Sequence, residues 1–146
     1  MNHTPPKTDL TIKEVVDRTV LGVDWGERRI GVAIKPAGQD WPIPKEVLHA
    51  RNQDQAVAAL RRTIADSGAE AVVVGLPVHP DGRQAAAIKR FCRRTRRNMQ
   101  GVRWFFVDER LTSETADSIT IKDGRGRPND DVAAALILET FIASCR

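Results

Sequence analysis

The chain has 146 residues, of which 41% are hydrophobic and 29% are charged, enough for one ordinary domain with a core. Its longest apolar stretches are too short to cross a bilayer, and its net charge of +4 is compatible with a polyanionic partner without requiring one. The polar start lacks the apolar run of a secretory signal, and Cys92 and Cys145 lie too far apart for a paired metal motif. We therefore expect a cytoplasmic protein with two reduced thiols.

The first eighteen residues show no clear periodic pattern and carry Pro5 and Pro6. We expect residues 1–18 to form a flexible arm ahead of a single domain over residues 19–146. Within the arm, Ile12–Val16 could form a short turn or docking segment.

Three strands are predicted at the start of the domain. Thr19–Asp24 is a β-branched, apolar run, and Arg29–Lys35 resumes the pattern after a turn at Trp25–Arg28, so the two predict a hairpin. A short third strand is expected within Trp41–His49, where two prolines limit its length.

Helices and strands alternate after the hairpin. The continuous apolar run Ala71–Leu76 is typical of a strand buried on both faces. Alternating units require parallel strands joined by right-handed crossovers, so the sequence predicts an α/β fold. Its mixed five-stranded sheet has an antiparallel three-strand meander followed by parallel strands, and helices flank it. The remaining predicted elements are helices over Asn52–Ser67, Gln84–Met99, Thr112–Lys122 and Asp131–Ser144, and a strand over Val102–Val107.

One predicted helix carries a dense run of positive charge. Lys89–Arg97 reads KRFCRRTRR, with six basic residues and no acid. Helical spacing turns Ile88, Phe91 and Thr95 toward the core. The charges either bind nucleic acid, in which case we expect contacts from Lys89, Arg93 and Arg97, or form an ordinary solvated face.

Acidic residues recur where predicted strands end and where the last helix begins. Asp24 ends the first strand, Asp108 and Glu109 follow the last one, and Asp130 and Asp131 open the final helix. Strand ends meet at one edge of such a sheet, where open α/β sheets bind ligands. Clustered carboxylates repel one another unless a hard cation such as Mg²⁺ lies among them, and such ions promote phosphodiester hydrolysis. Each acid alone could be a turn residue, a surface ion pair or a helix cap, so only the set of three indicates a phosphodiesterase.

Four sequence blocks in a fixed order carry a resemblance to a known family. With them, the chain resembles the YqgF/RuvX family of RNase H-like, Holliday-junction-resolvase-like proteins described as pre-16S rRNA nucleases. The resemblance covers about Val20 to Ile142 and implies an RNase H-like fold. The blocks are LGVDWGERRIGVAI (Leu21–Ile34), VVVGLPVHPDG (Val72–Gly82), VDERLTSETAD (Val107–Asp117) and DDVAAALILETFI (Asp130–Ile142).

The resemblance implies catalytic, metal-binding roles for Asp24, Glu109 and Asp130, with Mg²⁺ or Mn²⁺ as the cofactor. Asp130 is favoured over Asp131 because it precedes the Ala133–Ala134 pair by three positions.

Two arginines, Arg29 and Arg110, occupy basic positions of the family's motifs. The resemblance implies that they contact the substrate backbone, and a simpler role for either is to balance the carboxylates.

The chain departs from the family in two places that affect substrate binding more than fold. The segment between the third and fourth blocks is shorter, and its loop Asp123–Pro128 is rich in glycine and less basic. Lys35 and Pro36 stand where a serine-aspartate pair is often found.

The function implied by the resemblance is a metal-dependent endonuclease that processes the 5′ end of pre-16S rRNA. Alternatives are a Holliday-junction resolvase acting on branched DNA and a nucleic-acid binding module with little catalysis. A phosphotransferase of the actin and sugar-kinase type, suggested by VDWG at the first hairpin, would need two domains. No aromatic platform for single strands is evident, so RNA and DNA remain open. We expect no membrane partner and a monomer or homodimer.

Overall fold

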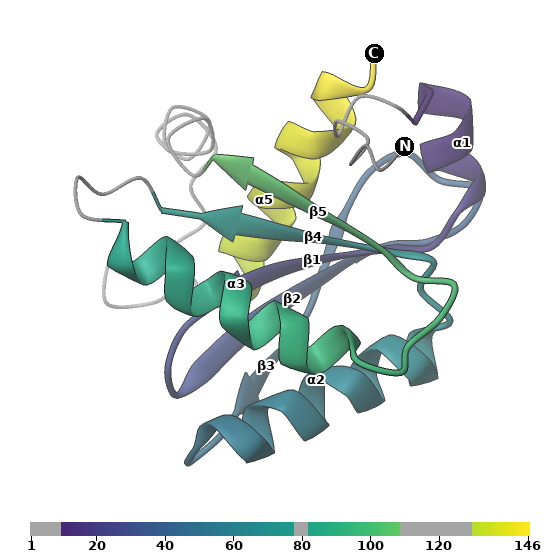
Figure 1. Cartoon of the computed structure of the whole chain (residues 1–146). Coiled ribbons are helices and arrows are strands. Elements are labelled where there is room, and N and C mark those ends of the chain that lie inside the picture. Colours follow the sequence, from purple (N-terminus) through teal and green to yellow (C-terminus); the bar gives the residue numbers. More distant parts are fainter. Residues whose placement is uncertain (1–9, 78–81, 109–129) are drawn as a thin grey trace, which may run out of the picture.

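The computed structural model describes residues 10–77, 82–108 and 130–146, and these form a sheet with helices on both faces (Figure 1). The strands stand in the order β3-β2-β1-β4-β5. They are β1 (Val20–Trp25), β2 (Arg29–Lys35), β3 (Ile43–His49), β4 (Ala71–Leu76) and β5 (Arg103–Asp108). The helices are α1 (Ile12–Asp17), α2 (Gln53–Ser67), α3 (Arg83–Arg96) and α5 (Asp130–Ser144).

The strand pairing confirms the predicted mixed sheet. β1 pairs with β2, and β2 with β3, in antiparallel fashion, whereas β4 is parallel to both β1 and β5. β1 runs one residue beyond Asp24, β2 and β4 have the predicted bounds, and β3 and β5 differ from theirs by one or two residues. The helix expected over Thr112–Lys122 lies outside the described residues. Because β1 and β4 are parallel, their carboxyl ends lie at the same edge of the sheet, the edge at which Asp24 is found.

The two faces of the sheet are covered by different helices, with α2 and α3 on one face and α5 on the other (Figure 1). Side chains alternate along a strand, so β1, β2, β4 and β5 each contribute to two separate cores. Leu21 and Val23 pack with α2 and α3, whereas Val20 packs with α5. The predicted inward residues of α3 are confirmed, because Ile88, Phe91 and Thr95 are all buried.

Residues 10–18 are not a flexible arm, and the short segment considered for Ile12–Val16 is the helix α1. Thr11 caps α1 by accepting a hydrogen bond from the Glu14 backbone N–H, 3.1 Å away. Leu10 and Val15 are fully buried in the core that contains α5. The helix is too short for its periodicity to stand out in the sequence, and tertiary packing rather than intrinsic propensity stabilises it.

Lys35 is a buried anchor for this segment. Its side chain is fully buried, and Nζ donates to the carbonyl oxygens of Val16 (3.2 Å), Pro36 (2.8 Å) and Gln39 (2.9 Å). Burial lowers the pKa of Lys35, and the nearby charges of Asp17 and Asp40 oppose that effect. The residue therefore ties the end of α1 to the turn after β2.

The surroundings of Cys92 bear on the expectation of two reduced thiols. Burial raises the pKa of the Cys92 thiol to about 12, although Arg96 and Arg93 act against the shift, so the thiol stays protonated at neutral pH. Within the described ranges, no helix is long and apolar enough to cross a membrane.

Candidate active site and nucleic-acid surface

Asp24 faces α5 from the carboxyl end of β1. Val23 and Trp25 belong to the core under α2 and α3, so the alternation of side chains turns Asp24 to the opposite face. Its partner across the antiparallel ladder is Gly31 of β2. Asp24 is partly exposed and takes part in polar interactions with its surroundings.

Asp130, the first residue of α5, is packed directly on Gly31. A Cβ atom added to Gly31 would collide with the Asp130 carbonyl group and would lie 2.9 Å from the Asp130 Cβ. Since Gly31 is the ladder partner of Asp24, the absence of a side chain there brings the start of α5 onto Asp24. The structure thus brings together two of the three predicted acids.

A second glycine seats the same helix further along. A Cβ at Gly22 would come within 2.6 Å of the Leu138 Cγ and 2.7 Å of the Ala134 carbonyl oxygen. Real Cβ contacts are not this short, so both glycines are required for α5 to lie this close to the sheet. The position of Asp130 is therefore set by backbone packing along β1 and β2.

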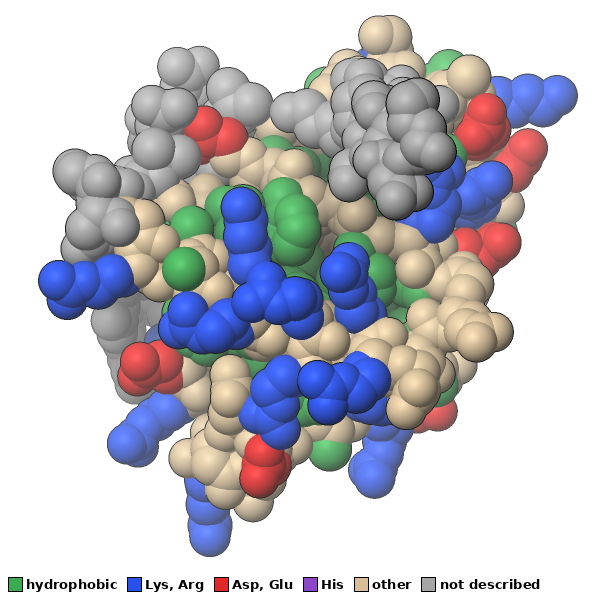
Figure 2. Space-filling model, viewed as in Figure 1, with side chains coloured by type: hydrophobic (Ala, Val, Ile, Leu, Met, Phe, Trp, Pro, Cys, Tyr) green, Lys and Arg blue, Asp and Glu red, His purple; other side chains and the backbone are tan. Residues whose placement is uncertain are grey.

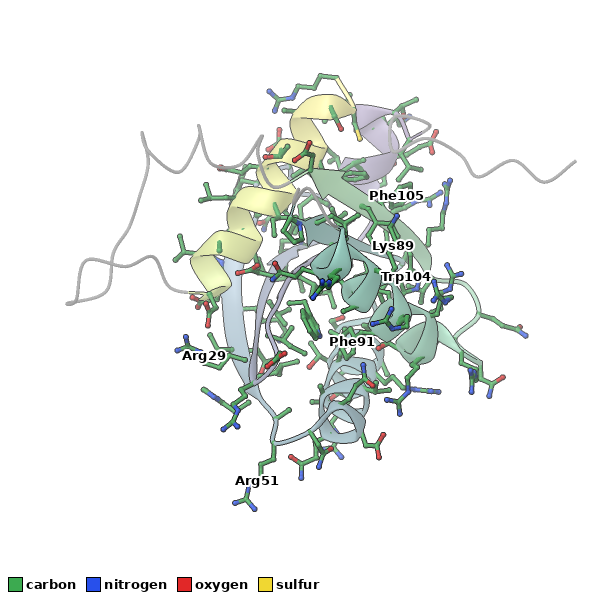
Figure 3. The ribbon with its side chains drawn as sticks, turned by 60° about the vertical axis from the view of Figure 1, so that its left-hand side comes forward. Arg29, Arg51, Lys89, Phe91, Trp104 and Phe105 are labelled. Carbon is green, nitrogen blue, oxygen red and sulfur yellow. The ribbon has the colours of Figure 1, made fainter. Side chains whose placement is uncertain are left out.

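The two neighbouring aspartates of α5 have different partners. Asp131 accepts a hydrogen bond from the Val132 backbone N–H at 3.0 Å, which is a local contact at the helix start. Asp130 instead pairs with Arg29, whose Nε lies 3.3 Å from Oδ2. Figure 3 places Arg29 beside the first turn of α5. This contact fits the charge-balancing role considered for Arg29, and the side chain is still 61% exposed.

Glu109 and Arg110 lie outside the described residues, directly after Asp108 at the end of β5. In the part of the chain that the structure describes, no group of three potential ligands is placed to hold a metal ion. Asp108 belongs to the α3 side, where it lines a hollow with Phe106 and Leu76.

A basic hollow that the sequence did not predict lies at the same strand edge as Asp24. It is about 500 Å³ in volume and is bounded by the start of β2, the end of β3 and the start of α2. Arg29, which pairs with Asp130, also lines it, so the hollow adjoins the acids. Arginines separated in sequence meet here only through β2–β3 pairing, and no local pattern indicates it. The lining residues are Arg28, Arg29, His49, Ala50, Arg51 and Gln55.

The predicted contacts Lys89, Arg93 and Arg97 lie on or just after α3, on the other face of the sheet. All three are exposed, and Figure 2 shows lysine and arginine side chains gathered over α3 around hydrophobic atoms. They are not next to Asp24 and Asp130, because α3 lies on one face of the sheet and these two acids lie on the other face, which α5 covers. Any role they have is in binding at a distance from these acids.

Comparison with protein families gives a match over nearly the whole chain. Residues 18–144 match the model of the family described as RuvX, Holliday junction resolvase. A protein from Chloroflexus aggregans is 36% identical over 138 residues, covering 89% of this chain and 96% of its own. One from Dechloromonas aromatica is 36% identical over 134 residues, covering 86% and 91%. Both carry the name "Putative pre-16S rRNA nuclease".

Solved structures with a similar fold are Holliday junction resolvases. RuvC of T. thermophilus, in complex with a Holliday junction substrate, has a TM-score of 0.57 at 17% identity, covering 86% of this chain and 94% of its own. The fowlpox virus resolvase has a TM-score of 0.55 at 13% identity, covering 86% and 99%. At such low identity these structures support the RNase H-like fold alone. The family match and the two relatives show that the chain belongs to the RuvX family of Holliday-junction-resolvase-like nucleases.

Proposed function

We propose that this protein is a metal-dependent endonuclease whose acids are Asp24, Glu109 and Asp130, and that its substrate is the 5′ region of pre-16S rRNA. The observation that carries the proposal is the packing of Asp130 on Gly31, the ladder partner of Asp24. A helix start seated on a strand end, with a carboxylate on each, is an arrangement that stability alone does not require, because like charges close together repel.

The residues at this place suit a divalent cation. Carboxylate oxygens are the donors that Mg²⁺ and Mn²⁺ favour, and Asp24 and Asp130 offer them from two rigid elements. The Arg29 guanidinium pairs with the Asp130 carboxylate, so this carboxylate already has a positively charged partner. Asp24 and Asp130 would hold the cation, with Glu109 as a third ligand from the chain after β5. A bound cation of this kind lowers the pKa of water and offsets charge on a phosphate oxygen.

The arginines beside the acids would position the substrate. Arg29 is mostly exposed, so its guanidinium can leave Asp130 and donate to a phosphate oxygen at little cost. The hollow lined by Arg28, Arg51 and His49 continues the positive charge away from the acids. Arg110 is proposed as a further contact because it follows Glu109 in the chain.

The RNA substrate is favoured by the names of the relatives, which are 36% identical over most of their length. Branched DNA is the second candidate, because the family and the solved neighbours are described as Holliday junction resolvases. For either substrate we propose a protein that acts in the cytoplasm.

The test uses labelled pre-16S rRNA and, separately, a synthetic four-way DNA junction, each with Mg²⁺, Mn²⁺ or chelator. The expected result is cutting that needs the metal and disappears in Asp24→Asn. The matched control is Asp66→Asn, which changes an exposed acid of α2 by the same single atom and should cut normally. The preferred substrate decides between RNA and DNA. Cutting that survives Asp24→Asn would contradict the proposed site.

A further inference from the structure

A strip of aromatic and basic side chains runs along the junction of α3 with β5. We call it the α3–β5 seam, and it includes two aromatic side chains from the strand and four basic ones from the helix and its end. β5 is an edge strand of the described sheet. Figure 3 shows Lys89 and Trp104 on the same side of the molecule, away from Arg29. The seam consists of Lys89, Arg93, Arg96, Arg97, Trp104 and Phe106.

Trp104 and Phe106 stand on the same face of β5, two residues apart. Both are partly buried against the core under α2 and α3, whereas the intervening Phe105 belongs to the other core. Each of the two rings lines a hollow, Trp104 one of about 450 Å³ and Phe106 one of about 320 Å³. The rings are therefore accessible at two points along the strand, a pairing that the linear sequence conceals.

Positive charge lies beside both rings. The Lys89 Nζ is 5.9 Å from the centre of the Phe106 ring, within reach of a cation–π contact. The hollow at Trp104 is lined by Arg93, Arg96 and Arg97. Three cations in one hollow suit an anionic ligand with acceptor oxygens, such as a phosphate.

The spacing of the rings favours an unpaired strand. Side chains two residues apart on a strand stand about 6.6 Å apart, roughly twice the 3.4 Å rise per nucleotide of a duplex strand. Neighbouring bases reach both rings only when they are unstacked and their faces are free, which base pairing prevents.

The seam leads toward the edge that carries the acids. The hollow at Phe106 is also lined by Asp108, the last residue of β5, and by Leu76, its partner at the end of β4. Val74 of β4 pairs with Val23 of β1, so Asp24 lies at the same end of the sheet. We propose that the α3–β5 seam binds single-stranded nucleic acid, with bases on Trp104 and Phe106 and phosphates on the cations of α3. This inference rests on the proposed function and names the form of substrate that the nuclease holds.

The test measures binding of a fluorescent, unstructured 12-nucleotide RNA by anisotropy, with chelator present so that no cutting occurs. Arg93→Gln/Arg97→Gln should weaken binding at least tenfold and should reduce the slope of log K against log salt by about 1.4, which is two phosphate contacts. Trp104→Leu should weaken it about 5-fold or more, as expected when one stacked base is lost. A fully paired duplex of the same sequence should bind more weakly than the single strand.

The controls remove equivalent groups elsewhere. Lys13→Gln/Lys45→Gln deletes two charges from α1 and β3, and Trp41→Leu deletes an indole that is 59% exposed at the other side of the sheet. Both should bind as the unmodified protein does. Circular dichroism melting checks that each variant folds, and if Trp104→Leu does not, the arginine variant still decides. Unchanged binding by Arg93→Gln/Arg97→Gln, or equal affinity for the duplex, would overturn the proposal.

The two proposals fail separately. If Asp24→Asn abolishes cutting while the seam variants bind normally, the seam is refuted and the nuclease stands. If the seam variants lose binding while the unmodified protein cuts neither substrate, the seam stands and the proposed function fails.

Discussion

The two faces of the sheet differ in how their helices are seated. On one face, glycines at 22 and 31 let α5 approach the strands so closely that a methyl group would not fit. On the other face, α2 and α3 rest on large side chains such as Leu60 and Phe91, and α3 presents cations outward. Close backbone packing fixes position, whereas long exposed side chains supply charge at little cost. This contrast fits the two proposals, in which the first face carries the acids and the α3–β5 seam on the second face binds part of the substrate.

The largest effect is expected when the two neighbouring aspartates of α5 are replaced one at a time. Asp130→Asn should lower the cleavage rate at least about 100-fold, the usual scale for loss of one preorganised charged group. The Asp131 carboxylate accepts a hydrogen bond from the Val132 N–H, a local contact at the helix start, so Asp131→Asn should retain cleavage within a few-fold. Single-turnover assays at saturating substrate measure both. Equal losses in the two variants would mean that the whole helix start, rather than Asp130, matters.

The Gly31→Ala variant tests whether close backbone packing positions Asp130. Gly31→Ala must displace the start of α5, because its Cβ collides with the Asp130 carbonyl group. We expect a loss of cleavage near 100-fold, since about 1 Å of misplacement can cost that much, together with about 1–3 kcal/mol of stability. Denaturant unfolding and cleavage assays report the two losses. A Gly31→Ala protein with normal activity would contradict the positioning argument.

Lys35 tests the same face at its far end, away from the acids. Lys35→Met removes the Nζ donor from the carbonyls of Val16, Pro36 and Gln39, of which the first two also accept from the backbone N–H groups of Gly38 and Gln39. We expect a loss of about 1–3 kcal/mol in unfolding free energy. Cleavage per folded molecule should be unchanged. Lys13→Met, on exposed α1 surface, is the control and should change stability by less than about 0.5 kcal/mol.

The sign of the pH dependence follows from the lowered pKa of Lys35. Between the folded pKa and the ordinary value of 10.5, the unfolded chain binds more protons at this residue than the folded chain does. The stability of the unmodified protein should therefore rise, relative to Lys35→Met, as the pH increases through that window. Unfolding curves collected up to pH 10.5 measure the difference. A relative fall would mean that the charges of Asp17 and Asp40 outweigh burial.

The smallest expected change in stability is at Arg29. Its pair with Asp130 is largely exposed, so Arg29→Gln should alter the unfolding free energy by only about 0–1 kcal/mol. We expect its main effect on substrate affinity, since the same side chain lines the basic hollow beside the acids. Binding assays and unfolding curves separate the two, and a large loss of stability with normal affinity would assign Arg29 a structural role instead.

The sequence predicts the sheet well because its signals are local. The apolar run Ala71–Leu76 is the observed β4, and the helix expected over Asn52–Ser67 is α2 with Asn52 as its cap. The sequence offered a docking segment at Ile12–Val16 only as one possibility, because the packing of Leu10 and Val15 depends on contacts with distant residues.

Only part of the candidate site could be predicted from local signals, because the rest depends on how the strands pair. Strand ends and the start of the last helix pointed to Asp24 and to Asp130 or Asp131, and the family resemblance favoured Asp130. Only the register of β1 with β2 reveals that Gly31 lies between Asp24 and Asp130. The alignment of Trp104 with Phe106 follows from strand alternation once β5 is known to face α3. In the sequence the two rings are separated by Phe105, which belongs to the other core, so they do not stand out as one aromatic surface.

The most direct test of the central claim is to measure cutting and binding side by side in Asp24→Asn and in Arg93→Gln/Arg97→Gln. The account predicts that Asp24→Asn binds the 12-nucleotide RNA normally and does not cut, with Asp66→Asn normal in both assays. It predicts that the arginine variant binds at least tenfold more weakly and yet cuts at a near-normal rate when substrate saturates it. If Asp24→Asn cuts normally, or if both variants lose binding and cutting together, the division of roles between the two faces is contradicted.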